Sequence, residues 1–290
     1  GMWDFDSSSA KVRDLQSDYL ARLYRLGVRG FRMDAVKHID AEDVKALKQA
    51  MAKKIEVPEQ DIYWIQEVIG NAGEAKDIQP SNYFDTGTVT QFAFAGAMKS
   101  NVPGSLNALS DLRERLGDIK RNPYAIPTDK ANVFVTNWDT ARNDGAITYK
   151  NDSMYALANA FMLAYDYGTP RLLSDYKYDV NDNGAPGAIA TEVPDVDFDE
   201  ACSTKDGEWN CQQRWTTTRG MIAFHNYVDG TAVEQWQDDG ANNIAFSRGD
   251  KGFVAINNST EDKTAEYTTS MPDGEYCDVY GVQDCSKTVT

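Results

Sequence analysis

The amino-acid sequence predicts a parallel α/β fold followed by a smaller all-β domain. The first observation is that helix-like and strand-like segments alternate through the first two thirds of the chain. The second is a change of pattern after about residue 230, where short apolar runs alternate with Asn, Gly and Asp turns. Strands that alternate with helices form βα units and a parallel sheet, whereas short strands separated by turns are typical of all-β domains. We expect a boundary near 228–235, with domains at 1–230 and 231–290.

The expected helices carry apolar residues at helical spacing. A run of serines supplies N-cap residues at the start of the first helix, and Gly27 ends it. The expected helices are 7–27, 44–55, 106–116 and 154–163, and the expected strands are 28–34, 62–65, 132–136, 244–246 and 252–256. Residues 177–210 are rich in Asp, Asn, Gly and Pro, so we expect a long irregular loop there.

Length and composition exclude several classes of protein. A chain of 290 residues, with 41% hydrophobic and 26% charged residues, has enough apolar side chains for packed cores and does not resemble a disordered chain. No apolar run approaches the ~18 residues of a membrane-spanning helix. The formal net charge of −16 disfavours nucleic acid as a partner, since the phosphate backbone is also negative. This charge suits a neutral or cationic ligand or a metal ion, and equally serves solubility.

The four cysteines form two close pairs, Cys202 with Cys211 and Cys277 with Cys285. Neither spacing is the short one of a zinc site, and the chain has only two histidines to complete such a site. Two local disulfides are therefore favoured over metal binding, which indicates an oxidising compartment and a secreted protein.

Three carboxylates follow three different expected strands, namely Asp34, Glu67 and Asp139. The carboxyl ends of parallel barrel strands meet on one face, where catalytic residues stand. Arg32 lies two residues before Asp34 and therefore on the same face of its strand. A carboxylate in such a place costs desolvation energy unless it is paired or used. A structural ion pair or helix cap explains one such residue; three with an arginine favour a catalytic site.

Two carboxyl groups that face each other are the minimum equipment for glycoside hydrolysis, one as nucleophile or base and one as proton donor. A Ser-His-Asp triad is disfavoured, because neither His38 nor His225 accompanies a GxSxG segment. The sequence has no glycine-rich phosphate loop and no HExxH segment. Residues 179–184 imitate the start of an EF-hand loop, but Ala190 stands where the bidentate Glu is needed.

Three segments resemble the second, third and fourth signature regions of the α-amylase superfamily, in the right order: 30–38, 66–69 and 134–139. The later segments 209–215, 249–258 and 276–279 resemble its animal-type branch, which also has bacterial members. The resemblance implies the C-terminal part of a (β/α)8 TIM barrel followed by a C-terminal antiparallel β-sandwich domain. It begins partway into the family barrel and covers about five of the eight strands that closure takes. We therefore expect a fragment of a longer protein.

The resemblance implies endo-hydrolysis of α-1,4-glucosidic bonds in starch, glycogen and maltooligosaccharides, with retention at the anomeric carbon. Asp34 matches the nucleophile, and Glu67 matches the general acid/base. Asp139 matches the third carboxylate, which binds sugar hydroxyls and stabilises the transition state. Arg32 would hold Asp34 ionised, because an adjacent cation lowers the pKa of a carboxyl group.

The same resemblance implies substrate contacts and two bound ions. The substrate-binding positions are Arg32, Lys37, His38, Ile69 and Trp138, of which Trp138 replaces the histidine that the family usually has. Chloride would lie between Arg32, Asn137 and Arg171, where an anion favours the protonated form of a nearby general acid. Calcium would bind Asp4 and the main-chain carbonyl of His38, since oxygen atoms are the ligands it prefers.

Two other functions remain open at this point. The chain could be a catalytically impaired amylase-like protein that only binds starch. Trp138 and the missing N-terminal strands suggest this alternative. It could also be another α-glucan hydrolase or transglycosylase of the superfamily. In each case we expect a secreted monomer that acts on an α-glucan, without nucleic-acid or membrane partners.

Overall fold

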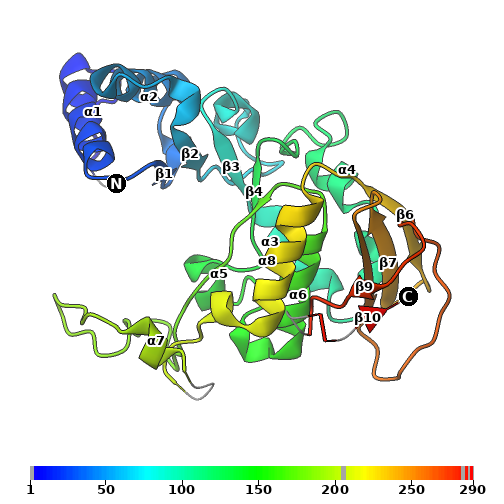
Figure 1. The fold of residues 1–290 in the computed structure, drawn as a ribbon. Coiled ribbons are helices and arrows are strands. Elements are labelled where there is room, and N and C mark those ends of the chain that lie inside the picture. The colour runs from blue at the N-terminus through cyan, green and yellow to red at the C-terminus, as the bar shows by residue number, and fades with distance from the viewer. Residues whose placement is uncertain (1–2, 204–206, 282–284, 287, 290) are drawn as a thin grey trace. The chain divides into compact units, whose positions relative to one another are not determined.

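The computed structural model describes residues 3–203, 207–281, 285–286 and 288–289. The chain forms two compact units, of which the first extends to Phe92 and includes Arg113–Asn132. The second comprises Ala93–Leu112 and the chain from Val133 onward. Figure 1 shows the elements in chain order. Within the described residues, no helix has the length and apolar character that crossing a membrane requires.

A parallel sheet organises the first unit. Its strands are β1 (Gly30–Met33), β2 (Tyr63–Gln66) and β3 (Thr88–Gln91), paired side by side in parallel. The register runs from Gly30 opposite Tyr63 to Met33 opposite Gln66. The next strand is β4 (Ala131–Val133), whose last residue belongs to the second unit, and β5 (Thr169–Pro170) follows in that unit. The strand order in the sheet is β1-β2-β3-β4-β5.

Two helices flank the start of this sheet, α1 (Ala10–Arg25) and α2 (Ala41–Ile55), and they pack on each other. The Asp40 carboxylate caps α2 by accepting the Glu42 N–H at 2.9 Å. The helix buries its apolar stripe, and Met51 is fully enclosed with Trp64 of β2 in the core of this unit. Burial of each such side chain contributes about 1.5–3 kcal/mol to stability.

The outer side of α1 is not enclosed by the described residues. Leu15 and Tyr19 are 61% and 63% exposed, while Leu20 and Ala21 are buried. A cavity of about 620 Å³ lies between this helix and β1, with a mostly apolar lining that includes Leu20 and Phe31. Among the described strands, β1 pairs only with β2 and is therefore the edge of the sheet.

The second unit combines helices with an antiparallel sheet. The helices α6 (Ser153–Ala164) and α8 (Thr216–Val228) pack on each other, and the sheet order is β6-β7-β8. Every residue of β7 is buried, and its Phe246 lies edge-on to Phe161 of α6. The sheet strands are β6 (Val233–Asp238), β7 (Asn243–Arg248) and β8 (Gly252–Asn257).

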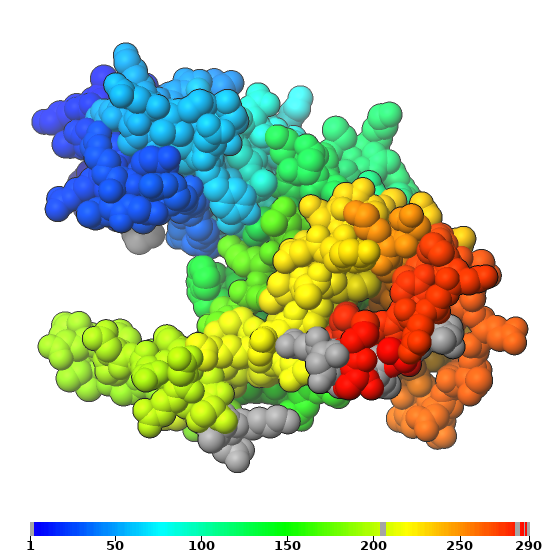
Figure 2. Space-filling model, in the orientation of Figure 1, coloured from blue at the N-terminus to red at the C-terminus, as the bar shows by residue number. Residues whose placement is uncertain are grey.

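The remaining elements are short. They are α3 (Phe92–Asn101), α4 (Leu112–Gly117), α5 (Trp138–Arg142), α7 (Phe198–Ala201) and the antiparallel pair β9 (Tyr276–Cys277) and β10 (Thr288–Val289). Single 3-10 turns cover Val36–His38, Glu59–Asp61, Lys76–Ile78, Pro80–Tyr83, Leu106–Leu109, Tyr149–Asn151 and Gln212–Arg214. The loop around 180–200 is largely exposed and projects from the body of the second unit (Figure 2).

A buried arginine joins α6 and α8 to the antiparallel sheet of the second unit. Arg248, at the end of β7, donates to the Ala164 carbonyl at 2.5 Å, to the Thr231 carbonyl at 2.9 Å and to the Val228 carbonyl at 3.5 Å. The last carbonyls of a helix lack partners within the helix and carry partial negative charge. One guanidinium therefore satisfies the C-terminal ends of α6 and α8 together.

The main elements of the sequence prediction are confirmed. The expected helices 7–27, 44–55 and 154–163 correspond to α1, α2 and α6, and both expected disulfides, Cys202–Cys211 and Cys277–Cys285, are present. The expected helix 106–116 is wrong as one element, since it divides into a 3-10 turn and α4. The first amides of this segment bind the turn between β6 and β7. Leu106 N–H donates to the Asn242 side chain, and Asn107 N–H donates to the Ala241 carbonyl.

Candidate active site

One guanidinium joins two carboxylates at the carboxyl end of the parallel sheet in the first unit. Arg32, near the end of β1, donates through Nη1 to Asp34, and its Nη2 lies 3.3 Å from Glu67 Oε2. The strand register explains why the two carboxylates lie close together. Met33 lies opposite Gln66, and Asp34 and Glu67 directly follow these last strand residues. The Glu67 N–H also donates to the Met33 carbonyl at 2.9 Å.

The turn after β1 closes around Glu67. Ala35 adopts a left-handed conformation with φ of 48°, and its N–H donates to Glu67 Oε2 at 2.8 Å. The next amide, that of Val36, donates to the Glu67 carbonyl at 3.1 Å. The Glu67 side chain is only 14% exposed, whereas that of Asp34 is 73% exposed. Two neighbouring carboxyl groups therefore have different environments, which is a basis for dividing acid and base roles between them.

The charge state of Asp34 is set by its neighbours. The hydrogen bond from Arg32, followed by a hydrogen bond with Glu67, holds the pKa of Asp34 below its ordinary value, and slight burial opposes this only in part. Asp34 is therefore ionised across the neutral range and into the acid range. An exposed, ionised carboxylate is the form that can act as a nucleophile.

A second ion pair lies in the neighbouring loops. Lys37 donates to the Ile69 carbonyl at 3.2 Å and pairs with Glu74. Sequence reasoning singled out Lys37 and Ile69 but not Glu74. A carboxylate in the loop after β2, facing a lysine in the loop after β1, is the signal that could have found it. His38 lies exposed at the end of the 3-10 turn Val36–His38.

The two residues expected to bind calcium form only part of a site. Asp4 is exposed, and its carboxylate accepts the Phe5 N–H at 2.8 Å. Across the described residues, no group of three or more His, Cys, Asp or Glu side chains is arranged to hold a metal ion. Calcium takes six to eight oxygen ligands, and Asp4 with the His38 carbonyl would supply few of them. The described residues therefore do not by themselves fit the ion, and calcium stays a prediction.

The third carboxylate belongs to the second unit, on the short helix α5. Asn137 and Thr140 cap this helix reciprocally, with Thr140 N–H donating to Asn137 Oδ1 at 2.8 Å and Asn137 N–H to Thr140 Oγ1 at 3.0 Å. Trp138 is 49% exposed and Asp139 is also exposed. The Asp139 side chain makes no hydrogen bond or ion pair with any described residue, so the backbone of α5 alone orients it.

Two of the residues expected to bind chloride also lie in the second unit. Asn137 is 2% exposed, and its Nδ2 is a buried donor without an acceptor among the described residues. Arg171, just after β5, donates its N–H to the Val133 carbonyl at 2.8 Å, and its guanidinium lies 5.7 Å from the ring centre of Phe134. A buried donor that lacks an acceptor, on a residue expected to bind an anion, fits that ion. The third residue, Arg32, belongs to the first unit.

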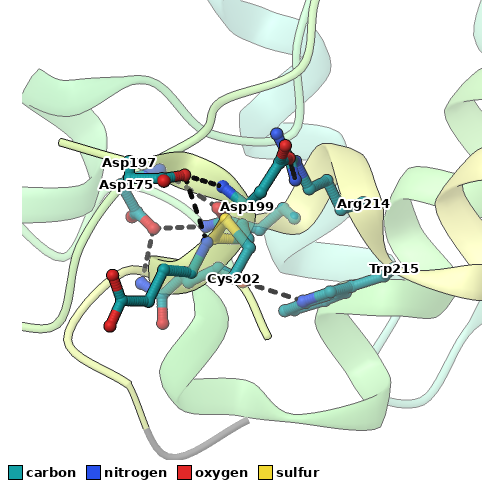
Figure 3. Close-up of a disulfide and its surroundings, with 10 residues drawn as sticks. Asp175, Asp197, Asp199, Cys202, Arg214 and Trp215 are labelled. Carbon is teal, nitrogen blue, oxygen red and sulfur yellow. Dashed lines mark hydrogen bonds and ion pairs between the residues drawn. A yellow bond between two sulfur atoms is a disulfide. The ribbon is translucent and has the colours of Figure 1, made fainter. Parts of the chain in front are cut away.

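A network around the first disulfide was not expected from the sequence. The Asp175 carboxylate accepts from the side chains of Asn210, at 2.5 Å, and of Gln212, beside Cys211 and its partner Cys202 (Figure 3). Burial raises the pKa of Asp175, and the two amide donors oppose that rise. The network fastens the disulfide loop to the segment that follows β5.

Comparisons with known proteins agree with the fold and the signature segments. Residues 234–289 match a family model described as the alpha amylase C-terminal all-beta domain. The chain is 38% identical over 277 residues to the alpha-amylase of Streptomyces violaceus, which covers 95% of this chain and 44% of that protein. It is 36% identical over 284 residues to the alpha-amylase-related protein of Drosophila teissieri, which covers 96% of this chain and 56% of that protein.

A solved structure agrees as well. Alpha-amylase I of Eisenia fetida, in a variant complexed with maltohexaose, is similar to this chain with a TM-score of 0.84 and 31% identity. That similarity covers 98% of this chain and 59% of the other. The expected fold, the C-terminal part of a barrel followed by an all-β domain, is thereby confirmed. The chain spans about half the length of the curated relatives that it matches.

Proposed function

Since this chain is an alpha-amylase homologue along 95% of its length, we propose that it performs endo-hydrolysis of α-1,4-glucosidic bonds in starch and glycogen. The observation that carries this proposal is the contact of one guanidinium, that of Arg32, with both Asp34 and Glu67. Retaining glycosidases keep their two carboxyl groups about 5–5.5 Å apart, and inverting enzymes about 6.5–9.5 Å. Two carboxylates on a single guanidinium favour the shorter separation and therefore retention.

The two carboxyl groups divide the reaction between them. Glu67 donates a proton to the glycosidic oxygen as the bond from that oxygen to the anomeric carbon breaks, and Asp34 forms a bond to the same carbon. Glu67, now ionised, then takes a proton from water, whose oxygen attacks the anomeric carbon and releases Asp34. Arg32 supports the first step by keeping Asp34 ionised. The exposure of Asp34 suits attack on a bulky polymer.

The remaining residues have proposed roles in holding the glucan. Asp139 would bind sugar hydroxyls and stabilise the distorted ring in the transition state. Lys37, His38 and Ile69 would contact the sugar units on the side of the first two carboxylates. Trp138 is 49% exposed, and an indole has a large ring face that suits stacking on a pyranose. The maltohexaose complex of the Eisenia fetida homologue supports an oligosaccharide as the ligand.

Chloride is proposed as a bound ion, and calcium remains an expectation of the family resemblance. Asn137 and Arg171 would hold chloride together with Arg32, and the buried Asn137 Nδ2 supports this assignment. When bound, the anion would favour a protonated general acid.

If chloride acts in this way, Arg171→Gln removes activation by halide salts, whereas an unchanged response to chloride contradicts the assignment. The two disulfides support secretion into an oxidising compartment. That the chain acts as a monomer is proposed from the family resemblance alone.

The test is starch hydrolysis by the chain and by two matched variants. Glu67→Gln removes the acid/base group with little change of shape, so we expect a rate loss of about 10²- to 10⁴-fold. Glu114→Gln changes an exposed carboxylate on α4 in the same way and should leave the rate within twofold. If the parent chain is active and Glu67→Gln hydrolyses starch at the same rate, Glu67 takes no part in catalysis.

A second candidate function is starch binding without efficient hydrolysis. Trp138 favours it, because this residue replaces the histidine usual in the family. Isothermal titration with maltohexaose separates the two functions. Binding without release of reducing sugar supports the second function, and hydrolysis contradicts it. Transfer of glucan to an acceptor sugar, seen by chromatography, would indicate a transglycosylase instead.

A further inference from the structure

The helix α5 is too short to be stable by its own hydrogen bonds. It has only five residues, Trp138–Arg142, and carries Asp139, whose side chain has no hydrogen-bond or ion-pair partner among the described residues. Isolated helices shorter than about 12–15 residues are marginal in water. The position of the Asp139 carboxylate therefore depends on what anchors each end of α5. The N-terminal end is fixed by the reciprocal cap of Asn137 and Thr140.

The C-terminal end of α5 is fixed by the loop that follows β5. The Arg142 guanidinium lies 3.8 Å from the ring centre of Tyr178 and 5.4 Å from that of Tyr176. The same guanidinium donates to the carbonyls of Asn181 and Asn183, the latter at 3.2 Å. The Tyr178 hydroxyl donates to the Ala141 carbonyl, one of the last acceptors of the helix. Stacking and hydrogen bonds thus hold both the last side chain of α5 and the Ala141 carbonyl.

Tyr178 is itself held firmly. It is buried, and its N–H donates to the Tyr149 hydroxyl at 2.9 Å while that hydroxyl donates to the Tyr178 carbonyl at 3.3 Å. The Lys150 ammonium lies 4.1 Å from its ring centre. Cation–π contacts of this kind are stronger where water is excluded. The ring is therefore a rigid support for Arg142.

The disulfide loop fastens the same segment from its other side. Tyr176 forms an antiparallel bridge with Trp209, and Lys177 N–H donates to the Glu208 carbonyl at 2.7 Å. The Asp175 carboxylate binds the side chains next to Cys211 (Figure 3). A continuous set of contacts therefore runs from the Cys202–Cys211 loop through residues 175–183 to the end of α5.

We infer that Arg142 is a positioning residue for Asp139. It acts through the backbone of α5, by preventing the last turn from fraying, and it touches neither substrate nor reacting atoms. This inference rests on the proposed function for the role of Asp139 in the rate. Arginine suits this place better than lysine, because its planar guanidinium stacks on the Tyr178 ring while one of its nitrogens, Nη1, donates to both carbonyls.

The first test is a double-mutant cycle on maltohexaose hydrolysis. Arg142→Gln should lower kcat about 10- to 100-fold, since a small misplacement of a catalytic group costs that much. In an Asp139→Asn background the same change should cost less than about twofold, because the carboxylate it positions is already gone. Arg142→Lys should recover only part of the rate. Arg219→Gln, an exposed arginine on α8, is the matched control and should change nothing.

Equal losses in both backgrounds would overturn the inference, because Arg142 would then act independently of Asp139. An unchanged kcat in Arg142→Gln would overturn it as well. If the unsubstituted chain does not hydrolyse maltohexaose, the proposed function fails, and the inference is decided by a second measurement.

That second measurement is amide hydrogen exchange, which needs no activity. The Ala141 and Asn143 amides donate within α5, to Asn137 and Asp139. Arg142→Gln should speed their exchange about tenfold or more, while amides of α6 stay unchanged, because only the short helix loses its anchor. Tyr178→Phe removes one hydrogen bond to the same end and should give a smaller increase. Unchanged exchange at Ala141 and Asn143 would contradict the anchoring role.

Discussion

The two units of this chain differ in how their helices and strands are enclosed by neighbouring residues. In the first, α1 exposes Leu15 and Tyr19, a largely apolar cavity borders β1, and that strand is a sheet edge among the described strands. In the second, every residue of β7 is buried, and Arg248 satisfies the ends of two helices. Both disulfides also lie in the second unit.

This difference shows which forces hold the candidate active site. Asp34 and Glu67 stand on the unit whose first helix exposes Leu15 and Tyr19, and a few local contacts fix them. Those contacts are the Arg32 guanidinium and the backbone amides of Ala35 and Glu67. Asp139 stands in the second unit, in the first turn of a very short helix. Substitutions in the two units should therefore affect stability and activity in different proportions.

The largest effect on stability is expected at Arg248. Arg248→Met leaves the carbonyls at the ends of α6 and α8 buried without their donor, which should lower the free energy of unfolding by about 3 kcal/mol. Urea unfolding measures this change. Arg219→Met, on the exposed side of α8, is the control and should stay within about 0.5 kcal/mol. Equal unfolding midpoints for Arg248→Met and the parent chain would contradict the capping role.

Next in size is a pH effect on activity at Arg32. Arg32→Gln removes the cation that lowers the pKa of Asp34, so that pKa should rise. Because the nucleophile must be ionised, the acid limb of the pH–rate profile should move to higher pH. Measurement of kcat/KM for maltohexaose from pH 3 to 8 checks this shift. If the acid limb of the profile lies at the same pH in Arg32→Gln and in the parent chain, ionisation of Asp34 does not limit the reaction.

A smaller effect is expected on the pH dependence of stability at Asp175. Its pKa is raised in the folded state, so folding favours the protonated form. The stabilisation is present below the unfolded pKa and is lost as the pH rises through the folded value. The parent chain should therefore gain stability over Asp175→Asn as the pH falls from 7 to 4. Thermal unfolding at several pH values tests this, and a constant difference would contradict it.

The smallest effect is expected on the exposed face of α1. Leu15→Lys should change the free energy of unfolding by no more than about 0.5 kcal/mol, because this side chain is 61% exposed. Leu20→Ala, on the buried side of the same helix, should cost about 2 kcal/mol, the low end for such a truncation, because Leu20 borders the cavity beside β1. Urea unfolding of both variants sharpens the comparison. A large loss for Leu15→Lys would mean that this face is covered in solution.

Local patterns in the sequence predicted much of the fold and the core of the site. Arg32, Asp34 and Glu67 were identifiable because each stands at or after a short apolar run. Their mutual contact follows from the parallel register of β1 and β2. The left-handed backbone at Ala35 could not be predicted, since no glycine or asparagine marks it.

Residues whose role depends on distant partners were missed for the same reason. Glu74 acquires its role from Lys37, and Asp175 from Asn210 and Gln212, each more than 30 positions away. The helix α3 was also missed, because its small and apolar residues give no clear amphipathic stripe. Spacing along the chain carries no information about such pairs.

The most direct test of the central claim is the anomeric form of the sugar first released from maltohexaose. The claim is that Asp34 and Glu67 act as the closely spaced pair of a retaining glycosidase. Proton NMR during the first minutes of hydrolysis distinguishes the two anomers before they interconvert. Retention predicts that the α-anomer appears first. Initial release of the β-anomer would mean inversion and would contradict the assignment of Asp34 as a nucleophile.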